Sequence, residues 1–221
     1  MKRNGFKSLL FGMLFLLGFV VWTTLIQTVD VQPAGQNGTD IGFATINCWF
    51  HQMTGAHMVI YTITDWLGLV PIFICMVFAG IGLIQLIKRK NLLKVDYDIL
   101  VLGIYYIIVI FGYLIFEMIP INYRPILIDG FMEASYPSST TLLVLSVMPT
   151  LWFQAKRRMK NEALLKCVSL FSILFSIFMV VGRTVAGVHW LTDIVGSILL
   201  STGLFLLYRA IVLIIDEKME A

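Results

Sequence analysis

Charged residues are scarce in this chain. Asp, Glu, Lys and Arg make up only 13% of its 221 residues, whereas 59% are apolar. A soluble domain carries about a quarter charged residues, so the composition excludes a water-soluble fold. The three cysteines include no CxxC pair, which excludes a disulfide framework and a cysteine-based zinc site. A net charge of +3 is too small to indicate nucleic-acid binding.

Long apolar stretches take the place of the missing charge. A membrane-spanning helix needs about 20 residues and a connection, so this length suits roughly five to seven spans. We expect six, at residues 8–27, 66–87, 99–119, 140–153, 164–181 and 190–215. The first stretch lacks a small-x-small cleavage site after it, which favours a retained anchor over a signal peptide. The sequence thus predicts an all-α integral membrane bundle of six transmembrane helices, one domain over 1–221 with an outer loop at 28–65.

The Lys and Arg residues divide unequally between the two sides of this bundle. Fourteen of the sixteen fall on one side: Lys2, Arg3, Lys7, Lys88, Arg89, Lys90, Lys94, Lys156, Arg157, Arg158, Lys160, Lys166, Arg209 and Lys218. The positive-inside rule therefore predicts that both termini are cytoplasmic. Only Arg124 and Arg183 fall on the outer side. Because an arginine there has no topological role, both are candidate functional residues.

A histidine and an aspartate follow Arg183 at short spacing. His189 and Asp193 are four residues apart, so on a helix they share one face and Asp193 can accept the Nδ1 proton of His189. The ring would then present Nε2 as a nucleophile or base. Arg183 is six residues earlier, and its guanidinium fork matches two oxygens of a phosphoryl group. The segment therefore predicts phosphoryl chemistry on the outer side.

Three segments together resemble the type 2 phosphatidic acid phosphatase superfamily, the lipid phosphatases related to vanadium haloperoxidases. The signatures of that family are Lys-x6-Arg-Pro, Pro-Ser-Gly-His and Ser-Arg-x5-His-x3-Asp. The matching residues are Arg124-Pro125 for the first, Pro137-Ser138 for the second, and Arg183, His189 and Asp193 for the third. The resemblance covers residues 60–213, and its six-span layout agrees with the apolar stretches.

The resemblance implies a phosphatase mechanism. His189 would attack phosphorus to form a phosphohistidine, which water then hydrolyses, and Asp193 would orient the ring and stabilise its charge. Arg124, Arg183 and Ser138 would bind the phosphoryl oxygens. No metal or other cofactor is implied, since two arginines can stabilise the charge of phosphoryl transfer. The expected partners are the bilayer and a lipid phosphate or diphosphate, such as phosphatidic acid or a polyprenyl diphosphate, at the extracytoplasmic face of the cell membrane.

Two positions depart from the family pattern. Glu117 stands where the first signature has Lys, and Thr140 stands where the second has His. That His is the family's general acid, and such acids contribute about 10²- to 10⁴-fold. Because a phosphate leaving group needs a proton less than an alkoxide does, Thr140 favours lipid diphosphates over phosphatidic acid. Glu117 has three interpretations: it pairs with Arg124, it lies away from the site, or it substitutes for the missing acid.

Two histidines of the outer loop are further candidates. His51 and His57 are six residues apart and have no acidic or Cys partner nearby, which favours an interfacial position beside Trp49 over a zinc site. A more specific alternative is that one of these histidines replaces the general acid that is missing at Thr140. Two other functions remain open: a weakly active or non-catalytic relative that binds lipid phosphates, and a channel or transporter. The few charges within the spans and the absence of an inverted repeat argue against transport.

Overall fold

The computed structural model describes residues 3–220, and their regular structure is helical. The helices are α1 (Arg3–Thr28), η1 (Gln36–Gly38), α2 (Ala44–Thr54), α3 (Met58–Leu67), α4 (Leu69–Arg89), η2 (Leu92–Lys94), α5 (Tyr97–Met118), α6 (Ser139–Arg158), α7 (Glu162–Val185) and α8 (Leu191–Met219). Extended segments in the described range pair only as three isolated antiparallel bridges. The prediction of an all-α fold is confirmed. Lys2, assigned above to the cytoplasmic side, lies outside the described residues.

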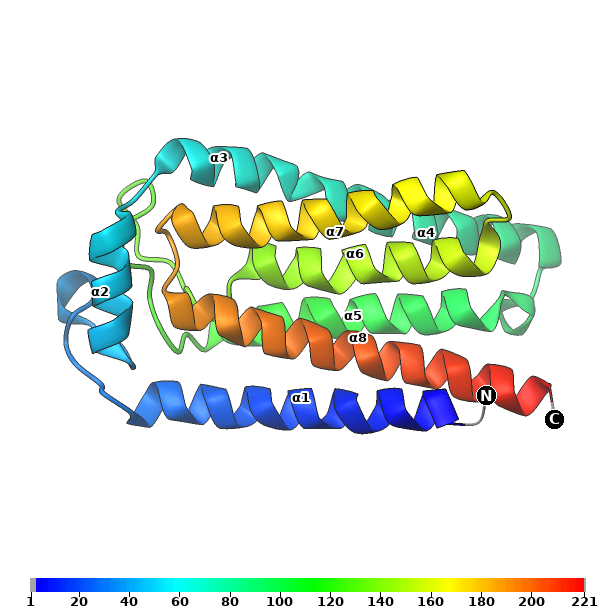
Figure 1. Cartoon of the computed structure of the whole chain (residues 1–221), viewed down its shortest axis with the longest axis horizontal. Helices are drawn as coiled ribbons and strands as arrows, with labels where there is room; N and C mark the ends of the chain where they lie inside the picture. Colours follow the sequence, from blue (N-terminus) through cyan, green and yellow to red (C-terminus); the bar gives the residue numbers. More distant parts are fainter. Residues whose placement is uncertain (1–2, 221) are drawn as a thin grey trace.

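The long helices form a bundle, and α2 lies across one end of it (Figure 1). α6 occupies the centre, where it packs against α4, α5, α7 and α8, while α1 packs along α8. The beginning of α1 and the end of α8 lie at the end of the bundle opposite α2 (Figure 1). The segment predicted as an outer loop at 28–65 is largely helical, because it contains η1, α2 and most of α3.

Five segments are long and apolar enough to cross a membrane. They are Asn4–Thr28, Met58–Arg89, Tyr97–Met118, Glu162–Val185 and Leu191–Met219. The second segment joins α3 to α4, so the expected stretch at 66–87 begins eight residues earlier than predicted. The stretch expected at 140–153 is the 20-residue helix α6, which is not among the five.

The central position of α6 explains why it is less apolar than the other long helices. Several of its buried polar groups bond to neighbouring helices: Tyr105 Oη donates to the Ser146 carbonyl at 2.9 Å, and Gln154 Nε2 donates to Tyr208 Oη at 2.6 Å. A helix surrounded by protein can satisfy such groups, whereas a helix facing lipid tails cannot. Hydropathy alone therefore underestimates the length of this helix, which was expected at 140–153 and spans Ser139–Arg158.

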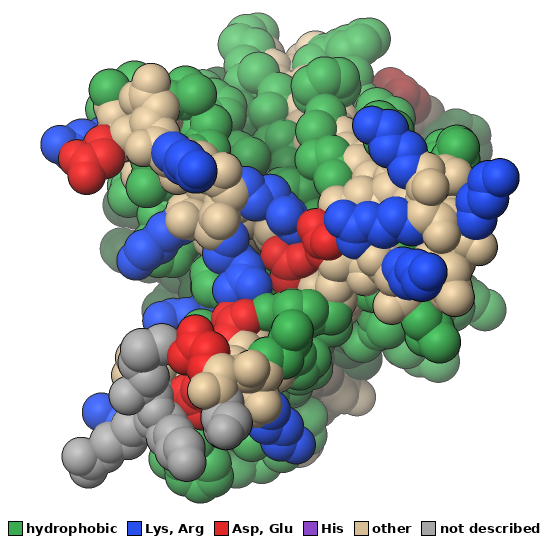
Figure 2. Space-filling model, turned by 90° about the vertical axis from the view of Figure 1, so that its right-hand side faces the viewer, with side chains coloured by type: hydrophobic (Ala, Val, Ile, Leu, Met, Phe, Trp, Pro, Cys, Tyr) green, Lys and Arg blue, Asp and Glu red, His purple; other side chains and the backbone are tan. Residues whose placement is uncertain are grey.

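Charged side chains gather at the end of the bundle away from α2 (Figure 2). There Arg158 Nη2 lies 2.8 Å from Asp98 Oδ2, and Arg157 lies 3.2 Å from the same carboxylate and 2.6 Å from Asp216. These ion pairs connect α5, α6 and α8, since each of those helices contributes one or more of the charges. The candidate site lies at the opposite end of the bundle.

Candidate active site

Residues from four segments meet at the α2 end of the bundle. The α5–α6 connection (119–138) folds back on itself through an isolated β-bridge between Tyr123 and Ala134. Arg124 and Ser135 therefore lie on the two extended segments that run side by side in this connection. The start of α6, the stretch from the end of α7 through the loop 186–190 to the first turn of α8, and α3 complete the site. The five residues that the resemblance assigns are all buried: Arg124, Ser138, Arg183, His189 and Asp193.

The loop that carries His189 is tightly held. Gly187 has φ +67°, and a Cβ added to it would lie 1.9 Å from the Gly55 carbonyl oxygen, so both the backbone conformation and the space require glycine. His57 N–H donates to the Ala186 carbonyl at 2.9 Å. The segment between α2 and α3 thus packs directly against the 186–190 loop.

His189 and Asp193 do not bond directly, which corrects the expected Nδ1 contact. Asp193 Oδ2 lies 3.9 Å from His189 Nδ1, beyond hydrogen-bonding distance. Ser135 stands between them: Nδ1 is 3.0 Å from its carbonyl oxygen, and its hydroxyl donates to Asp193 Oδ2 at 2.5 Å. His189 lies before the start of α8, so the i to i+4 spacing of a helix does not bring its ring over Asp193. The Asp193 carboxylate instead accepts a hydrogen bond from the Trp190 N–H at 2.9 Å.

The protonation state of His189 follows from these contacts. A carbonyl oxygen only accepts, so the neutral ring carries its proton on Nδ1 and a lone pair on Nε2. Burial lowers the pKa of His189 well below its usual value, and the neighbouring cations Arg183 and Arg124 lower it further. The ring is therefore neutral at neutral pH, as a nucleophile requires.

The two arginines share an aromatic neighbour that the sequence did not single out. The Tyr61 ring centroid lies 4.9 Å from Arg183 Cζ and 5.8 Å from Arg124 Cζ. Arg183 Nη2 also lies 3.3 Å from His189 Nε2, which brings one guanidinium to the ring nitrogen that carries the lone pair. Because a cation is attracted to an aromatic face, contact with the Tyr61 ring stabilises both guanidinium groups.

Each arginine has one carboxylate partner. Arg124 Nη2 lies 3.0 Å from Glu133 Oε2, and Arg183 Nη1 lies 3.7 Å from Asp65 Oδ1. Three buried N–H groups are left over: within the described residues, Arg124 Nε, Arg124 Nη1 and Arg183 Nε have no hydrogen-bond partner. Unpaired buried donors are costly, so these three point to an anion that the site is built to receive.

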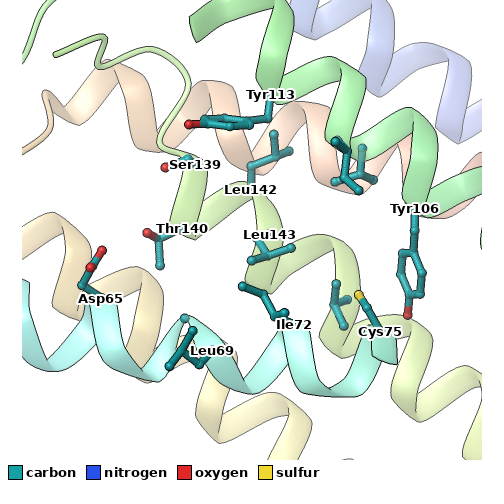
Figure 3. A pocket seen from close by; sticks show the side chains of 14 residues that line it. Asp65, Leu69, Ile72, Cys75, Tyr106, Tyr113, Ser139, Thr140, Leu142 and Leu143 are labelled. Carbon is teal, nitrogen blue, oxygen red and sulfur yellow. The ribbon is translucent and has the colours of Figure 1, made fainter. Parts of the chain in front are cut away.

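Two cavities open at the site. A polar cavity of about 230 Å³ is lined by Arg124, Glu133 and His189, together with Tyr113, Glu117 and Ser139. A larger cavity of about 570 Å³ is mostly apolar and runs between α4, α5 and α6, with Asp65 and Thr140 at its site end (Figure 3). Tyr113 and Ser139 line both, so the two cavities adjoin.

Three predicted residues take positions that sequence reasoning did not anticipate. Ser138 is fully buried and its hydroxyl donates to Thr141 Oγ1 at 3.1 Å, while its neighbour Ser139 lines the polar cavity. Thr140 lines the apolar cavity. Glu117 lines the polar cavity with Arg124, but the carboxylate that pairs with this arginine is Glu133.

The two outer histidines line neither cavity, and only the His51 ring contacts the 186–190 loop. His51 Nε2 lies 3.1 Å from the Gly187 carbonyl oxygen, and His57 Nε2 lies 2.7 Å from the Thr54 carbonyl oxygen. The described residues contain no group of three or more His, Cys, Asp or Glu side chains arranged to hold a metal ion.

Comparison with known proteins gives two matches. A family model described as the PAP2 superfamily matches residues 106–215, a region that contains Arg124, Ser138, Arg183, His189 and Asp193. The fold is similar to that of a transmembrane PAP2-type phosphatidylglycerolphosphate phosphatase from Bacillus subtilis, with a TM-score of 0.62. The two are 17% identical, and the match covers 94% of this chain and 96% of the other. No curated protein sequence matches the chain.

Proposed function

Since this chain belongs to the PAP2 superfamily, a family of membrane phosphatases, we propose that it hydrolyses a lipid phosphate or diphosphate through His189. One observation carries the proposal: within the described residues, two buried arginines leave three N–H groups without a partner, and one of these arginines contacts Nε2 of a histidine, the ring nitrogen that carries a lone pair. Such a cluster is suited to bind phosphoryl oxygens beside a nucleophile.

In the proposed mechanism, His189 Nε2 attacks phosphorus and the bond from phosphorus to the leaving oxygen breaks. Arg124 and Arg183 stabilise the negative charge on the phosphoryl oxygens, and Ser138 adds a hydroxyl after rotating away from Thr141. The positive charge on the phosphohistidine is balanced by Asp193 through Ser135. Water then attacks phosphorus and releases phosphate, which returns His189 to its neutral form.

We propose that lipid diphosphates are better substrates than phosphatidic acid. The Thr140 hydroxyl is too weak an acid to protonate the leaving oxygen, and the side chain lines the apolar cavity, so this position supplies no general acid. A phosphate leaving group tolerates that loss better than an alkoxide does. The apolar cavity adjoins the polar one and is suited to a lipid chain whose headgroup reaches His189.

We also propose an orientation for the bundle in the cell membrane, with α6 as a sixth span. The charged end, which carries the basic loops and both ends of the described chain, faces the cytoplasm (Figure 2). The candidate site at the other end then faces the extracytoplasmic side, where it meets substrates of the outer leaflet.

Phosphate release by detergent-purified protein tests the function. Phosphatidic acid and a polyprenyl diphosphate are the two substrates, His189→Ala is the active-site variant, and His57→Ala is a matched control because that side chain lines neither cavity. The proposal predicts release that His189→Ala abolishes and His57→Ala retains, with the diphosphate turned over faster. Lipid binding without release would indicate a non-catalytic relative. Solute flux into liposomes that His189→Ala leaves unchanged would indicate a transporter.

A further inference from the structure

Helix α2 has two unlike faces, and the inner face holds the 186–190 loop. Asn47 is buried, and its Nδ2 donates to Thr192 Oγ1 at 3.0 Å while its Oδ1 accepts from Thr192 N–H at 3.3 Å. His51 reaches the Gly187 carbonyl at 3.1 Å, and its ring lies 5.7 Å from the Trp190 ring. One face of α2 therefore contacts the chain before and after His189.

The outer face of α2 is apolar and exposed. Ile46, Trp49 and Met53 are 46%, 58% and 61% exposed, and their spacing places them within about 60° of one another around the helix. The helix contains no Asp, Glu, Lys or Arg. A helix that faces water usually carries charge on its outer side, so this face is suited to a less polar surrounding.

The neighbouring span places α2 at the level of the lipid headgroups. The apolar segment Met58–Arg89, formed by α3 and α4, has 32 residues, or about 48 Å of helix, whereas the hydrocarbon core of a bilayer is about 30 Å thick. The start of α3 therefore reaches the interfacial region, and α2 ends only a few residues before it, at Thr54. Val59, in the first turn of α3, is exposed and apolar as well.

We propose that α2 is an interfacial helix whose outer face, Ile46, Trp49 and Met53, inserts into the lipid surface on the side of the candidate site. Tryptophan is enriched at this depth, and an uncharged amphipathic helix lies in the plane of the interface. Through His51 the inserted helix contacts the 186–190 loop, and through Asn47 it contacts the first turn of α8, so it holds the chain on both sides of His189. The inference adds a lipid contact to the proposed function, but its tests do not depend on catalysis.

Spin labelling of the full chain in phospholipid vesicles tests the insertion. In a background of Cys48→Ser, Cys75→Ser and Cys167→Ser, a nitroxide is attached at Trp49→Cys or Met53→Cys. Asn37→Cys in η1 serves as the aqueous reference and Leu170→Cys, on the exposed face of α7, as the lipid reference.

Labels at positions 49 and 53 are expected to collide with oxygen in preference to a water-soluble nickel chelate, as the label at 170 does. A label at 49 that behaves like the label at 37 would overturn the proposal. Shielding from both reagents would also overturn it, because a protein partner or a second copy would then cover the face.

Amide hydrogen exchange tests the link to the 186–190 loop. The double variant Trp49→Ser with Met53→Ser weakens the lipid contact without touching Asn47 or His51, and Gln52→Ser on the same helix is the matched control. In vesicles, residues 186–190 should exchange several-fold faster in the double variant than in the wild type or the control. Equal exchange in all three proteins would refute the link, whether or not any of them releases phosphate.

Discussion

Tyr61 contacts both arginines of the candidate site, because both guanidinium groups lie over its ring, and we expect it to help position them. Replacing Tyr61 by Leu removes both contacts, and each such contact contributes about 0.5–2 kcal/mol. We expect kcat/KM for lipid phosphate hydrolysis to fall about tenfold or more. The inhibition constant of inorganic phosphate should rise in parallel, since the same arginines bind it.

Tyr61→Phe is the control for this change because it keeps the ring and removes only the hydroxyl. It is expected to retain most of the activity. Equal losses in Phe and Leu variants would show that the hydroxyl, rather than the ring face, is what the site uses.

The buried state of His189 sets the acid limb of the pH profile. The neutral ring is the proposed nucleophile, so protonation of His189 at low pH lowers kcat/KM. Because burial and the two arginines lower the pKa of His189 well below 6.5, the fall should occur well below that pH. Phosphate release measured from about pH 4 to about pH 8 checks this. An acid limb centred at 6.5 or above contradicts the proposed environment of the ring.

At the scale of elements, we expect the contact between α2 and α8 to affect turnover. Asn47→Ala removes two hydrogen bonds to Thr192 and leaves buried groups unpaired, at a cost of about 1–3 kcal/mol. The loss falls on the chain that orients His189, so kcat should decrease several-fold while KM changes little. Steady-state kinetics measure both. Gln52→Ala, on the exposed side of α2, should leave kcat unchanged; a decrease equal to that of Asn47→Ala would mean that α2 as a whole is sensitive to substitution.

Close packing of α1 against α8 depends on small residues. A Cβ added to Gly203 would lie 2.7 Å from Leu16 Cδ2 and 3.1 Å from the Leu16 backbone nitrogen, whereas a Cβ at Gly80 would meet nothing within 4 Å. Gly203→Leu should therefore destabilise the protein by about 1–3 kcal/mol, the usual cost of overpacking. Thermal unfolding in detergent compares it with Gly80→Leu, which controls for the change of residue type. The explanation by close packing fails if both variants unfold at the same lower temperature.

The helices themselves were largely predictable, because an apolar stretch of about 20 residues is a local property of the chain. The ends of the expected stretches at 8–27, 99–119 and 164–181 differ from those of α1, α5 and α7 by five residues or fewer. α2 was missed because the hydropathy of an 11-residue interfacial helix does not stand out. α6 differs in length because its polar groups bond to other helices, which no local pattern reveals.

On the scale of the whole molecule, the distribution of basic residues predicts the orientation in the membrane. A thiol at Asn37→Cys should react with an impermeant maleimide in intact cells, whereas a thiol at Lys160→Cys should react only after the cells are lysed. Both variants are made in a background free of the three natural cysteines. The reverse pattern would place the candidate site on the cytoplasmic side and contradict the positive-inside assignment.

The sequence by itself determined that this is a helical membrane protein, that its basic residues gather at one end, and that two arginines, a histidine and an aspartate belong to one candidate site. Composition, apolar length and the distribution of basic residues suffice for the first two points because each can be read along the chain. The grouping of the site residues rests on their outer-side placement and on the resemblance to the three signatures. Only the tertiary structure placed Ser135 between His189 and Asp193, Tyr61 in contact with both arginines, and Glu133 beside Arg124. The contacts of Ser135 and Tyr61 join residues more than fifty positions apart. Glu133 reaches Arg124 only because the connection between α5 and α6 folds back on itself. All three contacts therefore form only when the chain packs into its tertiary structure.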